Sequence, residues 1–312
     1  MKKVMCLVLC FIVISLPACS PPAQDEPAES ETSFTFTDDL GRTVTVRKCD
    51  RVACLIGSFA DIWHLAGGTE QIVAAAGDTW RYFDIPLGGE TANLGATKNI
   101  DLELLIASEP DLILASCNTS GNVELQPVFD ELGLTAAYFS VSTFDDYLRM
   151  LKICTEITGC KENYEEYGLK VKSRLDAAVN RSDGSEPSVL YIRAPGTSCR
   201  AKSSDGSVLG EMLRDLGCRN IADSDSSLLE NLSLEAIIDA DPDHIFVVLQ
   251  SAEAGAAEEV LKSTLLEHPA WASLTAVREG RFHIMDPTLY NLKPNERWGL
   301  AYEQLADILY PA

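Results

Sequence analysis

Strand-like and helix-like stretches alternate along the chain from residue 34 onward. FTFTDDLGRTVTV (34–46) alternates apolar and polar residues on both sides of DDLGR, which predicts a β-hairpin. RVACLIG (51–57) predicts a buried strand, and SFADIWHLAGG (58–68) has helical spacing that ends at a glycine pair. IVAAAG, LELLIAS, DLILAS, VELQPVFDELG and TAAYFS continue the alternation. Such an order predicts α/β layers with mostly parallel sheets.

A long charged stretch separates this region from a second region with the same alternation. KENYEEYGLKVKSRLDAAVN is rich in helix formers and has no proline, so we expect one helix over residues 161–182. After the loop sequence RSDGSEP, strand-like and helix-like stretches resume with SVLYIRA, SVLGEMLRDLG, LSLEAIIDA, HIFVVLQ, EEVLKSTLL, RFHIMD and ERWGLAYEQLADIL. The expected fold class is therefore α/β, with lobes at 34–160 and 187–312 joined by a single long helix.

Two segments of the chain are similar to each other at an offset of 132 residues. NIDLELLIASEPDLILAS (99–116) and NLSLEAIIDADPDHIFVV (231–248) share seven of eighteen residues. In each segment a small polar residue, Asp101 or Ser233, can cap a helix, and a proline and an apolar strand follow. Glu103 and Glu235 therefore take equivalent places in the two lobes, in the first helical turn and off the apolar stripe.

The first 33 residues have a different pattern, which predicts export. Two lysines precede the apolar run VMCLVLCFIVI and the small residues that follow it, as in a secretory signal peptide. Leu16-Pro17-Ala18-Cys19 resembles the lipobox of bacterial lipoproteins, which implies a signal peptide over 1–18 and lipidation of Cys19. The alternative is a soluble secreted protein in which Cys19 is incidental. Residues 19–33 hold proline, acidic and hydroxyl side chains and no large apolar one, so we expect a flexible spacer.

Charge and cysteine content exclude two classes of protein. The net charge is −22 and no cluster of Lys or Arg stands out, so a nucleic acid is not an expected partner. Seven cysteines follow Cys19, an odd number without CxxC spacing, which predicts neither a fully paired disulfide framework nor a cysteine metal motif. The sequence leaves open whether any of them, such as Cys154 and Cys160, form a pair.

Several segments of the chain resemble those of a known family. The segment FTDDLGRTVTVRKCDRVACLIGSFADIWHLAGG, the two similar segments and the ending HPAWASLTAVREGRFHIMDPTLYNLKPNERWGLAYEQLADILYP resemble substrate-binding lipoproteins of ATP-binding-cassette (ABC) importers. The branch is the one that serves iron-siderophores, haem and cobalamin. The resemblance implies a class III fold, in which one rigid helix bridges two α/β lobes and the ligand lies between them.

The same resemblance implies that one glutamate in each lobe docks onto arginine pockets of the permease. Glu103 and Glu235 stand at the corresponding positions. The alternative is structural, because a glutamate in a first helical turn gains roughly 0.3 to 1 kcal/mol from the helix dipole without any partner.

Ligands of open α/β sheets bind beyond the carboxyl ends of the strands, so the loops there supply the candidate site. The loops span residues 57–59, 78–84, 116–122, 193–202, 250–255 and 286–297. Their aromatic and cationic side chains suit a large, planar or anionic ligand. The candidates, with two polar side chains added, are Ser58, Trp80, Arg81, Tyr82, Asn118, Arg193, Lys202, Tyr290 and Arg297. Arg193 is favoured because it ends a strand in an acidic chain, whereas Arg297 could instead pair with an acidic neighbour.

The sequence thus predicts an extracytoplasmic, lipid-anchored binding protein that performs no catalysis and has no cofactor of its own. It is expected to capture an iron-siderophore, haem or cobalamin-type chelate and deliver it to a permease dimer with ATPase subunits. A haem ligand could use His64 or a tyrosine axially.

Three different functions compete with this prediction. Binding of free zinc or manganese is disfavoured because the four histidines lie far apart in the sequence. An extracytoplasmic hydrolase is disfavoured because the chain has no GxSxG or HExxH motif. A ligand sensor would present the same bound state to a receptor in place of a permease.

Overall fold

The computed structural model describes residues 33–230, 232–250 and 255–311. The predicted signal peptide, Cys19 and all but the last residue of the predicted spacer lie outside this part of the chain. Within the described ranges, no helix combines the length and the apolar character needed to cross a membrane.

A parallel five-stranded sheet with strand order β5-β4-β3-β8-β9 forms the centre of the N-terminal lobe. Its strands are β3 (Val52–Cys54), β4 (Ile72–Ala75), β5 (Ala92–Asn93), β8 (Leu112–Ser116) and β9 (Ala136–Phe139). The helical elements are α1 (Gly57–Leu65), η1 (Thr69–Gln71), α2 (Asp78–Tyr82), α3 (Leu102–Ala107), α4 (Ser120–Val123), α5 (Gln126–Leu132) and α6 (Phe144–Thr158). All residues of β3, β8 and β9 are buried, as expected for parallel strands covered on both faces.

Successive residues of β3 enter different cores because side chains alternate across a strand. Val52 and Cys54 belong to an apolar cluster with residues of α1 and α6. Ala53 belongs to a second cluster, which contains Leu105 of α3 and Phe129 of α5. The sheet is therefore covered on both faces, and its carboxyl edge is left for the site.

Two small antiparallel pairs complete this lobe. The predicted hairpin is confirmed as β1 (Phe34–Thr37) and β2 (Thr43–Val46), and the carboxylate of Asp38 in its turn forms a 2.8 Å ion pair with Arg42. The second pair, β6 (Gly95–Ala96) and β7 (Asn99–Ile100), was not predicted from the sequence. Its turn, residues 97–98, reaches the candidate site described below.

The C-terminal lobe is built on a second five-stranded sheet, in which only β11 runs antiparallel. Its strands are β10 (Ser188–Ala194), β11 (Arg200–Ala201), β12 (Arg219–Asn220), β13 (His244–Leu249) and β14 (Phe282–Met285). The helices are α9 (Val208–Asp215), α10 (Ile221–Ser224), α11 (Ser226–Glu230), α12 (Leu234–Ala240), α13 (Ala256–Leu261), α14 (Thr275–Arg278), α15 (Pro287–Tyr290) and α16 (Trp298–Leu309). Shorter helical turns are η3 (Lys262–Leu266), η4 (Pro269–Ser273) and η5 (Asn295–Arg297). The predicted fold class, α/β with mostly parallel sheets, is confirmed.

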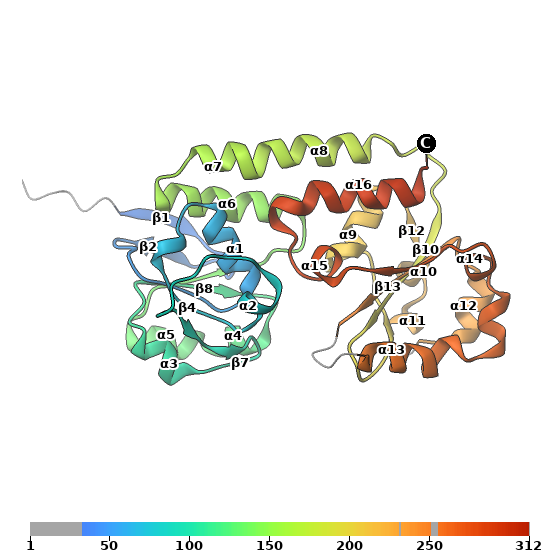
Figure 1. Cartoon of the computed structure of the whole chain (residues 1–312), viewed down its shortest axis with the longest axis horizontal. Helices are drawn as coiled ribbons and strands as arrows, with labels where there is room; N and C mark the ends of the chain where they lie inside the picture. Colours follow the sequence, from blue (N-terminus) through green and yellow to red (C-terminus); the bar gives the residue numbers. More distant parts are fainter. Residues whose placement is uncertain (1–32, 231, 251–254, 312) are drawn as a thin grey trace, which may run out of the picture. The chain divides into compact units, whose positions relative to one another are not determined.

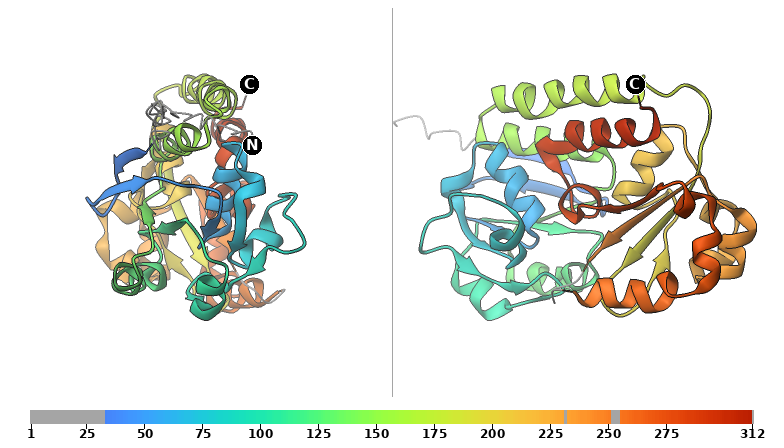
Figure 2. Two further views of the ribbon diagram at one scale, coloured as in Figure 1. Left: turned by 90° about the vertical axis from the view of Figure 1, so that its left-hand side faces the viewer. Right: turned by 45° about the vertical axis from the view of Figure 1, so that its right-hand side comes forward.

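A nearly continuous helix connects the lobes and lies beside α16 (Figures 1 and 2). It consists of α7 (Glu162–Tyr164), the π-helical turn η2 (Glu165–Leu169) and α8 (Lys170–Val179). The guanidinium of Arg174 donates to both carboxylate oxygens of Glu303 on α16, at 3.0 and 2.7 Å. Arg181 pairs with Asp307 at 2.6 Å and also donates to the carbonyl of Tyr310. The linker helix is thereby fastened to the last helix of the C-terminal lobe.

One apolar core continues from the first lobe into the second beneath the linker helix. It includes Trp63 of α1, Leu151 of α6, Leu175 of α8, Met212 of α9 and Trp298 of α16, all of them buried. Closely packed side chains rather than a flexible hinge therefore join the lobes.

The similar segments have the same local structure in both lobes, as predicted. The side chain of Asp101 accepts a hydrogen bond from the Leu104 amide at 3.0 Å, and Ser233 accepts one from the Ala236 amide at 3.3 Å. Each caps the helix that follows, α3 or α12, and each helix leads into a buried strand, β8 or β13. The equivalence of the two first helical turns is confirmed.

The seven cysteines after Cys19 all lie in the described part of the chain, and all are free thiols. Cys154 and Cys160, which the sequence left open as a pair, are not joined. Cys54 and Cys154 are fully buried, and burial raises the pKa of the nearby Cys49 thiol to about 12. The four buried cysteines, Cys54, Cys154, Cys199 and Cys218, act as small apolar residues of the core.

Candidate functional site

A cleft of about 470 Å³ lies where the carboxyl ends of strands from both lobes meet. All six loops predicted from the sequence contribute to it. Its walls are Ile56, Ser58, Asp78, Thr97, Lys98, Asn118, Thr119, Ser120, Arg193, Gln250, Asn291, Leu292 and Lys293. The cleft therefore has the location that open α/β sheets provide for ligands.

A second hollow of about 520 Å³ adjoins the cleft and shares part of its wall. Asp78, Thr97 and Lys98 line both cavities. Arg81 and Tyr82, at the end of α2, line only the second hollow, and the Arg81 guanidinium lies 5.1 Å from the centre of the Tyr82 ring. The second hollow thus extends the cleft toward α2, where an aromatic and a cationic side chain line it.

The cleft carries more positive than negative side chains, although the chain as a whole is acidic. Lys98, Arg193 and Lys293 line it, and Asp78 is the one acidic residue in its described wall. Arg193 is half-buried and donates to the side-chain oxygen of Asn291 at 3.4 Å. Burial and the neighbouring Arg193 lower the pKa of Lys293, while Asp78 partly offsets that effect. An anionic group entering the cleft would relieve this repulsion between cations.

Asp78 serves the architecture of the cleft as well as its charge. Its carboxylate accepts the backbone N–H of Gly57 at 2.9 Å, at the start of α1. A Cβ atom at residue 57 would lie 2.7 Å from the backbone nitrogen of Thr79, so only glycine allows α1 and α2 to approach this closely. Burial raises the pKa of Asp78, and the hydrogen bond from Gly57 opposes that shift.

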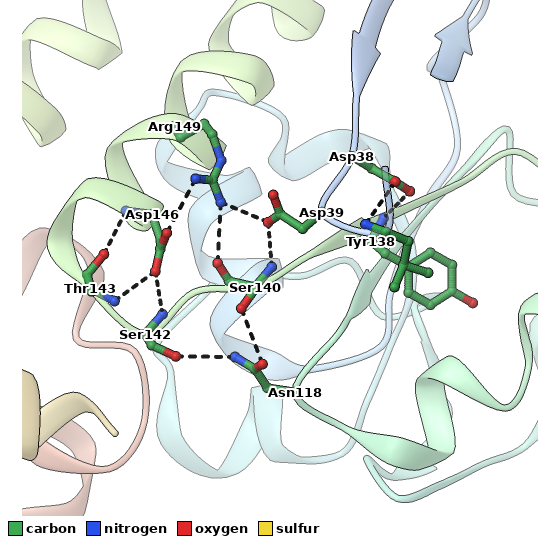
Figure 3. A network of polar contacts seen from close by, with 10 residues as sticks. Asp38, Asp39, Asn118, Tyr138, Ser140, Ser142, Thr143, Asp146 and Arg149 are labelled. Atoms are coloured by element: carbon green, nitrogen blue, oxygen red, sulfur yellow. Dashed lines mark hydrogen bonds and ion pairs between the residues drawn. The ribbon is translucent and has the colours of Figure 1, made fainter. Parts of the chain in front are cut away.

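The side-chain amide of Asn118 is held in the cleft by two serines (Figure 3). Its Nδ2 donates to the Ser142 hydroxyl at 3.4 Å, and its Oδ1 accepts from the Ser140 hydroxyl at 3.2 Å. The backbone N–H of Asn118 also donates to the hydroxyl of Ser116 at 3.2 Å. The orientation of this polar group is therefore set by the protein itself.

The two serines are fixed in turn by charged residues farther from the cleft (Figure 3). The carboxylate of Asp39, in the β1–β2 hairpin, accepts from the Ser140 amide at 2.6 Å and from Arg149 of α6 at 2.8 Å. Asp146 of α6 accepts from the Ser142 amide at 3.1 Å. The hairpin and α6 thus support one wall of the cleft.

The structure brings five of the nine predicted ligand-binding residues to the cleft region. Ser58, Asn118 and Arg193 line the main cleft, and Arg81 and Tyr82 line the adjoining hollow. Whether they contact a ligand stays a prediction.

The remaining four predicted residues lie elsewhere. Tyr290 is 1 % exposed, its hydroxyl donates to the carbonyl of Ala301, and it lines neither cavity. Trp80 is 45 % exposed on α2 but lines neither cavity. Lys202 also lines neither cavity, and burial lowers its pKa. Arg297 lies at the end of η5, outside both walls.

Several cleft residues were not selected from the sequence. Asp78, Gln250 and Asn291 belong to predicted loops but are neither aromatic nor cationic, the types that the selection favoured, whereas Lys293 is cationic and was left out. Lys98 lies outside every predicted loop, in the turn of the unpredicted β6–β7 pair. Lys202 and Lys293 are the two lysines of the predicted loops, so applying the cationic criterion to both would have identified Lys293.

The glutamates expected at the permease interface are both exposed and both lie in first helical turns, Glu103 on α3 and Glu235 on α12. Leu104 and Ile106 of α3 are also exposed. A hollow of about 500 Å³ beside α3 is formed by the N-terminal lobe alone, so it does not share the two-lobe character of the cleft.

The histidines lie away from the cleft. His64 is hydrogen-bonded to the Thr69 hydroxyl at 2.7 Å, and His268 caps η4. His244 and His283 face each other with a nitrogen–nitrogen distance of 3.3 Å and ring planes 20° apart. In the described ranges, no three His, Cys, Asp or Glu side chains are grouped so as to hold a metal ion.

The sequence comparison agrees with this arrangement. Residues 52–289 match the model of the periplasmic binding protein family. The match covers most of the chain, so the protein belongs to this family, whose members are the solute-binding components of ABC import systems and act outside the cytoplasm. No protein with a curated description matches the chain in sequence.

Solved structures show the same fold. The haem-binding protein RhuT from Roseiflexus sp. RS-1, in apo form, has a TM-score of 0.68 and 20% identity, over 84% of this chain and 98% of that one. SirA from Staphylococcus aureus, complexed with staphyloferrin B, has a TM-score of 0.65 and 22% identity, over 89% and 97%. A TroA-like binding protein from Xylanimonas cellulosilytica has a TM-score of 0.69 and 19% identity, over 88% and 99%. Identities this low establish the class III fold and not the ligand.

Proposed function

We propose that this protein captures an anionic metal chelate of the iron-siderophore class in the cleft between its lobes and delivers it to an ABC permease. The observation that carries the proposal is the cationic cleft wall formed by Lys98, Arg193 and Lys293 in a chain of net charge −22. Cations held close together repel one another, and a cleft lined by one sign of charge attracts ligands of the opposite sign. Carboxylate-rich or catecholate chelates of Fe³⁺ carry the complementary charge.

The size of the cleft supports the same class of ligand. Volumes of about 470 and 520 Å³ for the cleft and the adjoining hollow lie in the range of pockets that hold a drug-sized molecule. A bare metal ion would need a compact set of ligating side chains instead, and Asp78 is the one carboxylate in the described cleft wall. Among the structural relatives, SirA was solved with a siderophore and RhuT is a haem-binding protein, so both chelate classes belong in the test.

The experiment is a thermal-unfolding screen of soluble residues 20–312 against ferric siderophores, haem, cobalamins and free divalent metals. A ligand at about 100 times its Kd should stabilise the fold by roughly 2.7 kcal/mol, or roughly 5 to 10 °C in Tm. We expect this shift with an anionic ferric chelate. A shift with free Zn²⁺ or Mn²⁺ alone would mean that the ligand is a metal ion and not a chelate. A shift with cobalamin alone would mean that the positive charge of the cleft does not select the ligand.

We also propose that Cys19 carries a lipid anchor, because LPAC resembles a lipobox and the segment after it has a spacer composition. Two acyl chains on one residue hold a protein at a membrane far more firmly than one. In cells that express the full chain, the protein should sediment with membranes, and Cys19→Ser should release it or leave it unprocessed. If Cys19→Ser stayed with membranes after normal cleavage, another element would be the anchor.

A further inference from the structure

A short segment of the C-terminal lobe crosses to the N-terminal lobe just before α16 begins. Its central residue, Asn295, is 0 % exposed. The side-chain Nδ2 of Asn295 donates to the backbone carbonyl of Ser58 at 2.9 Å and to the carboxylate of Asp61 at 2.7 Å. Both acceptors are on α1, and Ser58 lines the cleft. One amide therefore joins the two lobes at the cleft.

Asparagine is the side chain that suits this position. The backbone φ of Asn295 is +54°, a left-handed conformation that Gly, Asn and Asp adopt most readily. Glycine has no side chain to cross between the lobes. Aspartate would place an additional oxygen against the Ser58 carbonyl and the Asp61 carboxylate. Only asparagine combines the backbone conformation with a donor for both acceptors.

The same segment carries three residues of the cleft wall, Asn291, Leu292 and Lys293. Lys293 is two residues before Asn295, and Asn291, which accepts a hydrogen bond from Arg193, is four residues before it. Ser58, whose carbonyl Asn295 binds, lies in the opposing wall. The location of Lys293 relative to the N-terminal lobe thus depends on where residue 295 is anchored.

We propose that Asn295 is a positioning residue, which fixes the 291–295 segment against α1 and so holds Lys293 and Ser58 at their places in the cleft. The proposal deepens the proposed function, because it assumes that the cleft is where the ligand binds. Its claim about the ligand-free protein does not depend on which ligand that is.

The test compares Asn295→Gly and Asn295→Asp with wild type by hydrogen–deuterium exchange of ligand-free residues 20–312. Both replacements tolerate the backbone conformation, so neither adds strain there. The matched control is Glu186→Gly, at an exposed residue in the loop before β10 that also has positive φ. We expect exchange at least tenfold faster in both variants for the amides of Phe59 and Ala60 on α1 and for peptides covering 291–297. The control should leave both regions unchanged.

The Asp variant adds a readout that a merely structural role would not produce. Asp61 is half-buried, and burial raises its pKa while the bond from Asn295 lowers it. The charged or titratable groups near Asp61 are His64 on α1, Tyr147 on α6, and Glu296 and Arg297 on η5. A second carboxylate beside Asp61 would share one proton with it at low pH.

Protection in Asn295→Asp should therefore recover toward the wild-type level between pH 8 and pH 5, relative to the Glu186→Gly control at each pH. Asn295→Gly should show no recovery. Wild-type protection of both regions in Asn295→Gly would overturn the proposal, and so would faster exchange confined to one of the two regions. The exchange experiment uses no ligand, so a negative result would contradict the role of Asn295 and not the proposed function. A negative ligand screen would likewise not change the result expected for Asn295.

Discussion

A double variant, Arg193→Gln with Lys293→Gln, is expected to bind its chelate at least about 100-fold more weakly than wild type. Each side chain would lose a charge-assisted hydrogen bond worth roughly 1.5 to 3 kcal/mol, and about 2.7 kcal/mol in total corresponds to a hundredfold change in Kd. The two residues come from different loops of the C-terminal lobe and face the same cavity. Titration calorimetry with the chelate that shifts Tm most would measure the loss.

The control removes the same amount of charge from the same lobe without touching the cleft. Lys262→Gln with Arg278→Gln is suitable, because both side chains are on the surface and outside both cavities. This pair should change Kd less than about threefold at 0.15 M salt, since screening weakens charge effects over such distances. An equal loss in the two double variants would mean that the overall field, rather than direct contact, holds the ligand.

The second large effect is expected on transport and not on binding. Glu103→Ala with Glu235→Ala should reduce cellular uptake of the chelate to below about a tenth of wild type while Kd stays unchanged. Two lost glutamate–arginine contacts would cost roughly 3 kcal/mol or more of docking free energy. Both glutamates are exposed and lie outside both cavity walls, so their replacement leaves the site intact.

Radiolabelled iron uptake in cells that depend on this protein would measure the effect, with equal expression verified. Glu162→Ala with Glu258→Ala is the matched control, because these glutamates are also exposed in first helical turns. The control variant should transport normally. Normal uptake by the Glu103 and Glu235 double variant would assign these residues to helix stabilisation alone.

Local features could be predicted from the sequence because their causes are local. The caps at Asp101 and Ser233 need only a small polar side chain before an apolar helix, and the central strands are continuous apolar runs. The loops at the carboxyl ends of the strands follow from the order of elements, which is why all six reach the cleft.

The identity of the cleft-lining side chains could not be predicted in the same way. Whether a loop side chain faces the cavity depends on contacts between lobes, which no short window of sequence contains. Tyr290 was selected for its ring, but the last helix covers it, and its hydroxyl bonds to Ala301. Asn295 lies in a predicted loop, yet its role depends on Ser58 and Asp61, more than 230 residues away.

The attachment of the linker helix to α16 affects which conformation the ligand-free protein adopts. Arg174 and Arg181 tie the linker to the C-terminal lobe, and the shared core ties it to the N-terminal lobe. Each surface ion pair contributes roughly 0.2 to 1 kcal/mol, but the core beneath them resists any large rotation. We therefore expect the conformation described here to be the dominant one in the ligand-free protein. If that conformation is the one that binds, little apparent affinity is lost to molecules in other conformations.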